Sequence, residues 1–157
     1  MLAREGIRYT IGLYNSIGDR GAYEDLTSVY TTDGRWILND GTVIEPLEQI
    51  IETSRAGAQR RGAFDEGSFQ RHLLGHSVIN VVDSATARSL HYVLIYTELG
   101  PDHAAVYRDD WRKVGDRWLL AQRINALEWI RPDSRFTIYG GGAPMAQEHL
   151  DLGFVLH

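Results

Sequence analysis

The fold class of this 157-residue chain is decided in its second half, above all by residues 104–129, AAVYRDDWRKVGDRWLLAQRINALEW. The triplet Val114-Gly115-Asp116 is typical of a turn and divides this stretch into two long segments with strand character, 104–113 and 117–129. Working outward, the remaining strand segments and turns of this half are 69–82, Asp83-Ser84, 85–99 and Gly100-Pro101-Asp102. We therefore predict a four-strand meander.

The first half of the chain has helical spacing instead. Apolar side chains recur every three or four residues at Ile7, Ile11, Tyr14 and Ile17, which predicts a helix over residues 2–17. Gly18 breaks this pattern and is expected to end the helix. The other elements expected in this half are a helix over 22–30, a turn at 33–34, a strand over 36–38, a hairpin turn at 39–41, a strand over 42–44, and a helix that starts at Pro46 and fades between Gly57 and Gly62.

Helices followed by an antiparallel meander predict an α+β fold. A strongly curved antiparallel sheet would wrap around the N-terminal helices as a cone-shaped α+β barrel with an internal cavity. We expect this domain to span residues 1–133. The tail, residues 134–157, contains three consecutive glycines and a weak helical pattern at 145–150, and we expect it to close the cavity mouth or to pack on a neighbouring subunit.

Composition narrows the possible functions. The chain has 16 Lys and Arg against 21 Asp and Glu, a net charge of −5, and no basic block, so we expect no nucleic-acid partner. The absence of cysteine excludes disulfides, thiolate zinc sites and cysteine nucleophiles. No secretory signal, no apolar run of about 20 residues and no glycine-rich phosphate loop are present. We expect a cytoplasmic protein without a membrane-spanning segment or a nucleotide cofactor.

Four polar residues stand in or beside apolar stretches that should face the inside of the domain: Tyr14, Asp19, His72 and Arg123. A small core does not bury such groups without partners. A tyrosine, a carboxylate, an imidazole and a guanidinium together can perform acid–base chemistry without a cofactor. The four residues therefore predict a catalytic cavity.

The order of these residues resembles the SnoaL-like group of the nuclear transport factor 2-like superfamily. The matching stretches are Tyr14-Asn15-Ser16-Ile17-Gly18-Asp19, Tyr30-Thr31-Thr32-Asp33-Gly34, Arg71-His72 and Trp118-Leu119-Leu120-Ala121-Gln122-Arg123, within residues 5–130. Inside that group the chain resembles bile-acid dehydratases and hexachlorocyclohexane dehydrochlorinase, and more distantly scytalone dehydratase. This resemblance implies a cofactor-independent lyase that acts on a hydrophobic cyclic or polycyclic small molecule.

The resemblance also implies roles for individual residues. His72 would be the catalytic base, Asp19 its carboxylate partner, Arg123 an anion-stabilising group, and Tyr14 a catalytic tyrosine where the dehydrochlorinase has a lysine. Residues expected to line the substrate cavity are Trp36, His76, Tyr92 and Tyr107. His76 departs from the family, because many relatives have asparagine at this position.

Elementary chemistry supports the same roles. A neutral imidazole is a competent base near pH 7, and a carboxylate that binds its other ring nitrogen fixes the tautomer and stabilises the imidazolium. A guanidinium can stabilise an enolate or a leaving anion, and a tyrosine can donate to a substrate oxygen. Proton removal beside a leaving group gives elimination, and proton removal beside a carbonyl without one gives isomerisation.

Structural alternatives exist for each of these residues. His72 could be a core histidine, Asp19 a helix cap, Tyr14 a core residue with its hydroxyl at the rim, and Arg123 a partner of Asp109 or Asp110 across the meander. A metal site at His72 and His76 is not expected, because four residues along a strand separate them by about 13 Å.

At the level of the whole protein, two other functions remain open. One is an isomerase or cyclase of the ketosteroid or polyketide type. The other is a non-catalytic ligand-binding module or an accessory subunit of a ring-hydroxylating dioxygenase, for which the cavity would be filled by side chains or a large iron-containing protein would co-purify. The resemblance implies a homo-oligomer, either a trimer or a dimer.

Overall fold

The computed structural model describes residues 2–136; the helices of this part lie in the first half of the chain, and strands alone follow them. In chain order they are α1 (Ala3–Arg20), the 3₁₀ helix η1 (Tyr23–Ser28), β1 (Tyr30–Ile37), β2 (Val43–Ile44), α2 (Leu47–Arg60), β3 (Gln70–Val81), β4 (Thr86–Thr97), β5 (Gly100–Val114) and β6 (Arg117–Ile130).

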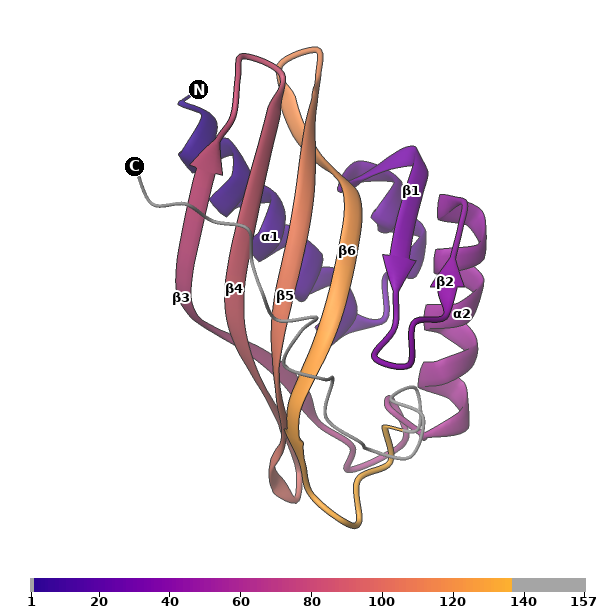
Figure 1. Ribbon diagram of the computed structural model, residues 1–157. Helices are drawn as coiled ribbons and strands as arrows, with labels where there is room; N and C mark the ends of the chain where they lie inside the picture. Colours follow the sequence, from indigo (N-terminus) through magenta and orange to yellow (C-terminus); the bar gives the residue numbers. More distant parts are fainter. Residues whose placement is uncertain (1, 137–157) are drawn as a thin grey trace.

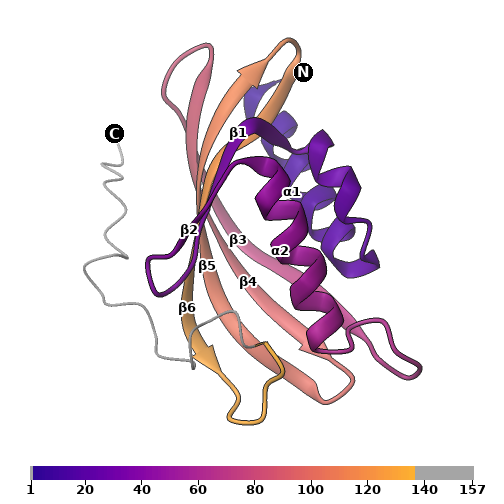
Figure 2. The same cartoon turned by 90° about the vertical axis from the view of Figure 1, so that its right-hand side faces the viewer.

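All six strands form one curved sheet in the order β2-β1-β6-β5-β4-β3 (Figure 1). The four long strands pair antiparallel with their sequence neighbours, which confirms the predicted meander. β1 adds to this meander by pairing parallel with β6. The sheet does not close on itself, and α1 and α2 lie on its concave side (Figure 2). The α+β fold with a curved sheet around N-terminal helices is thus confirmed.

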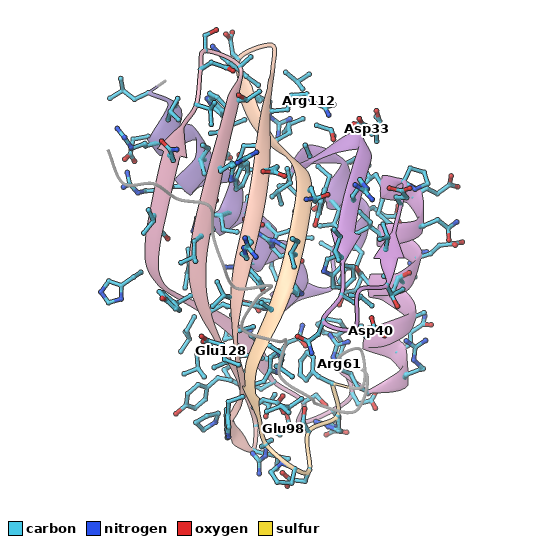
Figure 3. All side chains as sticks on the ribbon, in the orientation of Figure 1. Asp33, Asp40, Arg61, Glu98, Arg112 and Glu128 are labelled. Carbon is cyan, nitrogen blue, oxygen red and sulfur yellow. The ribbon has the colours of Figure 1, made fainter. Side chains whose placement is uncertain are left out.

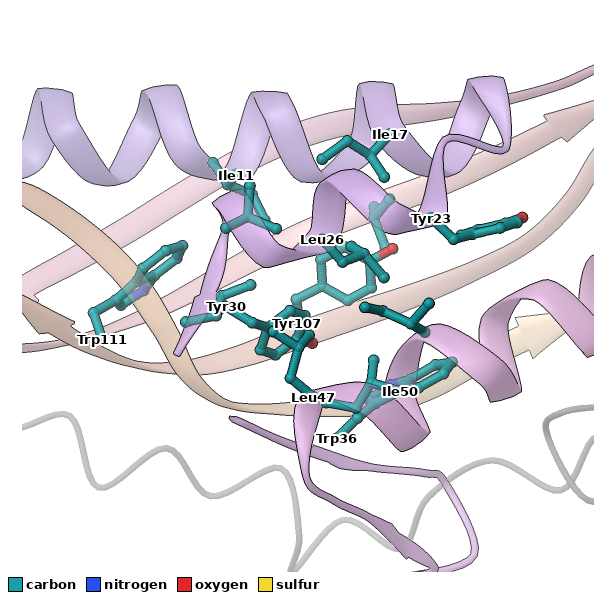
Figure 4. Packing of buried hydrophobic residues seen from close by; sticks show 14 of the residues in the cluster. Ile11, Ile17, Tyr23, Leu26, Tyr30, Trp36, Leu47, Ile50, Tyr107 and Trp111 are labelled. Atoms are coloured by element: carbon teal, nitrogen blue, oxygen red, sulfur yellow. The ribbon is translucent and has the colours of Figure 1, made fainter. Parts of the chain in front are cut away.

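The core lies between the helices and the concave face of the sheet. Ile7, Ile11 and Ile17 of α1 are at most 1% exposed, and they contact a cluster to which the sheet contributes large aromatic side chains such as Trp111 (Figure 4). Burying an isoleucine side chain fully contributes about 1.5–3 kcal/mol to folding. The apolar side chains that recur with helical spacing in the sequence are therefore the ones that pack α1 against the sheet.

The first helix ends later than expected. Gly18 is helical, and the helix ends at Gly21, whose φ of 69° is left-handed and whose N–H reaches the carbonyls of Gly18 and Ile17. A Cβ at Gly21 would lie 2.6 Å from the ring of Phe64, so this position requires glycine sterically as well. Because the helix continues for one further turn, Asp19 belongs to α1 itself and does not follow it.

The prediction of a second helix over 22–30 is wrong in two respects, the type of helix and the residue at which it ends. Only residues 23–28 are helical, as a 3₁₀ helix, and Tyr30 is the first residue of β1. Gly34, predicted as part of a turn, lies inside β1 where the register against β6 shifts. A Cβ there would lie 2.8 Å from the carbonyl oxygen of Thr31. Strand pairing with β6 outweighs the local turn preference, and glycine allows the irregularity.

The predicted turn at Gly100-Pro101-Asp102 is also wrong. β5 begins at Gly100, which pairs with Thr97, while Pro101 pairs with Tyr96. A register shift between Ile95 and Tyr96 accommodates this pairing. The consequence is that Asp102 and the next residue, His103, are strand residues and not loop residues.

Most of the predicted tail lies outside the described residues, including the expected helical pattern at 145–150. Residues 134–136 are described and lie beside the start of β5, where the Ser134 hydroxyl donates to Asp102 Oδ1 at 2.7 Å. In residues 2–136, no helix is both long enough and apolar enough to cross a membrane.

Candidate functional site

A cavity of about 80 Å³ lies between the concave face of the sheet and the helices. Aromatic and aliphatic side chains form much of its wall, among them Leu26, Trp36, Tyr107 and Phe136. The polar lining residues include Tyr14, Arg61, Gln70, His72, His103 and Asn125. The cavity wall is therefore mixed, with more apolar than polar surface and with several polar groups that could orient a small molecule.

His72 and Asp19 meet at one side of this cavity. The Nδ1 of His72 lies 2.6 Å from Asp19 Oδ1, and the backbone N–H of His72 donates to the same oxygen at 3.0 Å. The side chains are 15% and 13% exposed. β3 supplies the imidazole and the last turn of α1 supplies the carboxylate. With Nδ1–H donating to the carboxylate, Nε2 carries the lone pair of the neutral ring.

The carboxylate of Asp19 binds a residue from a distant part of the chain, which a helix cap does not do. Asp19 lies in the final turn of α1, so it cannot cap the N-terminus of a following helix as the capping alternative required. It accepts hydrogen bonds from the ring and from the backbone N–H of His72, which is 53 residues away in the sequence. His72 and Asp19 border a second, outer cleft between α1 and β3, which they share with Asn15 and Arg71.

Arg123 lies one layer behind the cavity wall. Its guanidinium Cζ is 4.0 Å from the ring centre of Tyr14 and 3.9 Å from that of Tyr107, and both of these rings line the cavity. Arg123 itself does not line it. Nε and Nη2 donate to the two carboxylate oxygens of Asp109 at 2.8 and 2.7 Å, and both side chains are fully buried. The alternative in which Arg123 pairs with Asp109 therefore matches its contacts.

The charge on this arginine is secured by its surroundings. Burial alone would lower the pKa of Arg123, but the adjacent Asp109 carboxylate and its hydrogen bonds hold that pKa well above the ordinary value. A guanidinium between two aromatic faces is also a favourable cation–π arrangement. Tyr14 and Tyr107 thus form a wall with a permanent positive charge behind it.

Two expected cavity residues, His76 and Tyr92, lie elsewhere, so their predicted placement is corrected. Tyr92 is 47% exposed because side chains alternate along a strand, and its neighbours His91 and Val93 are the ones buried on the concave side. His76 is exposed at the register shift in β3, between Leu74 and Ser77. The two other expected residues, Trp36 and Tyr107, do line the cavity.

His103 also lines the cavity, although no pattern in the sequence assigns it a role. Its Nδ1 lies 2.7 Å from Asp102 Oδ1, and the two residues are 1% and 3% exposed. Burial lowers the pKa of His103, and the carboxylate of Asp102 opposes this effect. The signal in the sequence is the adjacent Asp102-His103 pair, which the turn preference of Gly100-Pro101-Asp102 places in a loop and not at a cavity wall.

A second fully buried histidine, His91, belongs to the core and does not line the cavity. Its ring nitrogens lie 2.7 Å from the hydroxyls of Ser89 and Ser77, and Trp111 Nε1 donates to Ser89 Oγ at 2.6 Å. Burial lowers the pKa of His91 to about 4. Its Nε2 is 3.6 Å from Asp109 Oδ2, so this network packs against the carboxylate that holds Arg123.

No metal centre is apparent in the described part of the chain. Among residues 2–136, no three His, Cys, Asp or Glu side chains lie close enough together to hold a metal ion. The groups placed around the cavity are suited to binding a small molecule and to moving protons.

Solved structures with a similar fold include proteins with and without an assigned activity. A protein of unknown function from Nostoc punctiforme has a TM-score of 0.70 at 18% identity, covering 85% of this chain and 94% of that one. A putative scytalone dehydratase from Novosphingobium aromaticivorans has a TM-score of 0.70 at 17% identity, with 82% and 85% covered. LinA has a TM-score of 0.70 at 16% identity, with 83% and 88% covered. At these identities the likeness establishes the fold alone.

Comparison with curated proteins gave no match. A protein-family model described as the SnoaL-like domain matches residues 1–124, which include the helices, β1 to β5, the first part of β6, and the paired His72 and Asp19. This match confirms the resemblance inferred from the sequence, and the chain belongs to the SnoaL-like domain family.

Proposed function

We propose that this protein is a cofactor-independent lyase that removes a proton from a hydrophobic cyclic small molecule and expels a neighbouring leaving group. The observation that carries the proposal is the 2.6 Å contact between His72 Nδ1 and Asp19 Oδ1, made by an imidazole that lines a cavity with more apolar than polar surface. One of the structural neighbours is named as a putative scytalone dehydratase, a related activity.

The reaction begins at His72. Its Nε2 takes the proton from a carbon of the substrate, the electrons of that C–H bond form a carbon–carbon double bond, and the bond to the leaving group breaks. Asp19 holds the ring and stabilises the imidazolium that forms, as a carboxylate does in other histidine-based sites. Because the pair also borders the outer cleft, the proton can then pass to solvent.

Tyr14 and Arg123 support the developing negative charge. Tyr14 lines the cavity and donates a hydrogen bond to the substrate oxygen or to the leaving group. Arg123 does not contact the substrate in this mechanism and acts as a positioning residue, because the Tyr14 ring lies between it and the cavity. Its charge, 4.0 Å from the ring centre, favours the phenol as a hydrogen-bond donor.

The size and lining of the cavity favour a small ring as substrate. The cavity volume is about 80 Å³. Sites for drug-sized ligands usually measure about 300–1,000 Å³. A substrate with one ring is therefore favoured over a polycyclic one. Leu26, Trp36 and Tyr107 provide apolar contacts from three different elements. The polar groups on the wall would orient such a ring by its oxygen substituents.

The proposal is tested with cyclic β-hydroxy ketones, in which loss of water is followed by the absorbance of the conjugated product. We expect His72→Ala and Asp19→Asn each to lower kcat by about 100-fold or more while the proteins remain folded. His76→Gln is the matched control, because His76 lies on the same strand but is exposed and outside the cavity. Near-wild-type rates in both His72→Ala and Asp19→Asn would reject the mechanism.

The same assay separates elimination from isomerisation. Cyclic β,γ-unsaturated ketones carry no leaving group and report double-bond migration only. If these compounds react and the β-hydroxy ketones do not, the protein is an isomerase that uses the same base. If neither class reacts, and cyclic ketones do not exchange their α-protons in deuterium oxide, the protein is a binding module.

A further inference from the structure

Two buried polar atoms on residues of the cavity wall have no hydrogen-bond partner within residues 2–136: Nε1 of Trp36 and Oδ1 of Asn125. The two residues are only 6% and 4% exposed, and the indole of Trp36 belongs to the core cluster (Figure 4). An indole N–H can only donate and an amide oxygen can only accept. The cavity wall therefore holds a donor and an acceptor that the described part of the chain leaves unused.

Other polar groups of the same wall are already bound. The side-chain amide of Gln70 donates to the carbonyl of Gly18 at 2.7 Å, and its oxygen accepts from Arg61. The ring of His72 binds Asp19. The large majority of buried polar side-chain atoms in proteins have a partner, so two exceptions at one cavity point to a ligand that supplies the partners.

Strand pairing brings the two unused groups to neighbouring positions. β1 runs parallel to β6, and Trp36 is in register with Arg123. Asn125 follows two residues later on β6, about 7 Å from Arg123 and on the same face, because side chains alternate along a strand. The donor and the acceptor therefore stand close enough together for one small molecule to contact both.

The base of the proposed mechanism belongs to the other end of the sheet. His72 is on β3, and β6, β5 and β4 separate this strand from β1. The curvature of the sheet nevertheless brings both ends to one cavity, since His72, Trp36 and Asn125 all line it. A ring held by Trp36 and Asn125 would present its opposite edge to His72.

Unused buried groups make a cavity selective. A buried donor or acceptor has lost its contact with water, and this loss is recovered only when a ligand provides the missing partner. A site built in this way strongly rejects an analogue that lacks the matching group, because the polar group of the site then stays unpaired. Phenylalanine and leucine would fill similar space at these two positions without leaving a polar atom unpaired.

We propose that Trp36 and Asn125 select the substrate by two oxygen substituents on its ring. Trp36 Nε1–H donates to a carbonyl oxygen, and Asn125 Oδ1 accepts from a hydroxyl group. A carbonyl is the acceptor that also makes a neighbouring C–H acidic, as the base His72 requires. The substrate class is therefore a cyclic hydroxy ketone. The choice of a carbonyl rests on the proposed function, whereas the donor site and the acceptor site do not.

The test measures the affinity of the full-length protein for cyclohexanone, which only accepts, and for cyclohexanol, which also donates. Backbone amide signals follow each titration. Trp36→Phe should weaken the binding of cyclohexanone about tenfold, the effect of one buried hydrogen bond. Asn125→Leu should weaken cyclohexanol by a similar factor and leave cyclohexanone unchanged, since a ketone has no proton to donate.

Trp129→Phe and Asn80→Leu are the matched controls, because both residues are exposed strand residues outside the cavity. Both variants should bind the two rings as the unaltered protein does. The proposal is wrong if Trp36→Phe retains full affinity for cyclohexanone or if Asn125→Leu weakens both rings equally. It is also wrong if neither ring binds at millimolar concentrations.

A second measurement on the unaltered protein covers the case in which a variant does not fold. The indole N–H proton of Trp36 should move downfield when cyclohexanone is added, because the donor gains an acceptor. The side-chain carbonyl carbon of Asn125 should shift more with cyclohexanol than with cyclohexanone. An indole signal that responds to neither ring would overturn the assignment of Trp36 as the donor.

The outcomes for the two proposals are separable, because neither probe carries a leaving group beside an acidic C–H. Affinities that depend on Trp36 and Asn125 as expected, in a protein that converts no β-hydroxy ketone, support the two binding sites and reject the lyase. Conversely, turnover that depends on His72, with cyclohexanone affinity unchanged in Trp36→Phe, supports the lyase and rejects the binding sites.

Discussion

Two carboxylate-containing pairs near the cavity lie in opposite surroundings. His72 and Asp19 are 15% and 13% exposed; both border the outer cleft, and His72 also lines the cavity. Arg123 and Asp109 are fully buried behind the wall made by Tyr14 and Tyr107. In the proposed mechanism the first pair exchanges protons with a ligand and with water, while the second holds a charge in place. Exposure, together with residue type, distinguishes the pair proposed to react from the pair proposed to support it.

The largest effect is expected from removing the carboxylate of the buried pair. Asp109→Ala leaves the Arg123 guanidinium charged and without its bidentate partner, which should cost about 3–5 kcal/mol of unfolding free energy in urea titrations. The double change Arg123→Met with Asp109→Leu is the control, because it removes both charges and should recover most of the loss. A double variant as unstable as the single one would show that volume, and not charge, is responsible.

Asp19→Asn should lower turnover strongly and stability only moderately. We expect kcat to fall by about 100-fold, equivalent to about 2.7 kcal/mol of transition-state stabilisation, because the ring of His72 loses its orienting carboxylate. The unfolding free energy should fall by less than in Asp109→Ala, since Asp19 is partly exposed. Equal losses of stability in the two variants would remove the distinction drawn between the pairs.

The buried histidines predict how stability depends on pH. The pKa of His91 is lowered from 6.5 to about 4 in the folded protein, so between these values the unfolded chain binds more protons. The free energy of unfolding should therefore keep its value above pH 6.5 and decrease below it. His91 alone should account for a decrease of about 1.5 kcal/mol between pH 6.5 and 5. His103 contributes with the same sign. Urea titrations at several pH values measure the slope, which His91→Gln should reduce.

The smallest effect is expected at the surface pair of Arg112 and Asp33 (Figure 3). Both oxygens of Asp33 accept from Arg112 Nη1 at 3.0 Å, but the side chains are 49% and 62% exposed. Arg112→Gln should change the unfolding free energy by less than about 1 kcal/mol, because water screens the pair. A loss comparable to that of Asp109→Ala would contradict the argument from burial.

The parts of the fold that could be predicted are those with regular patterns of buried side chains. The spacing of Ile7, Ile11 and Ile17 located α1, and the turn at 114–116 located the hairpin of β5 and β6. The wrong turn predictions lie at Gly34 and at Gly100, where local turn preference conflicts with strand pairing. A glycine tolerates both outcomes, so only the pairing of distant strands decides between them.

The candidate site could be predicted in part. Tyr14, His72, Trp36 and Tyr107 were expected at a cavity and line it, whereas His76 and Tyr92 were expected there and lie outside. Both errors concern which face of the sheet a residue points to. A strand directs alternate residues to opposite faces, and a register shift changes which residues point to the concave face.

The sequence by itself determined the types of chemistry available to this protein: imidazoles, carboxylates and a tyrosine in apolar surroundings, with no cysteine and no basic block. The tertiary structure decided which of these groups act together. It paired His72 with Asp19 across 53 residues, placed Arg123 behind Tyr14, and brought His103 to the same cavity as His72. Residue type sets the chemistry a side chain can perform, but the partner, the burial and the face of the sheet depend on distant pairing that no local pattern encodes.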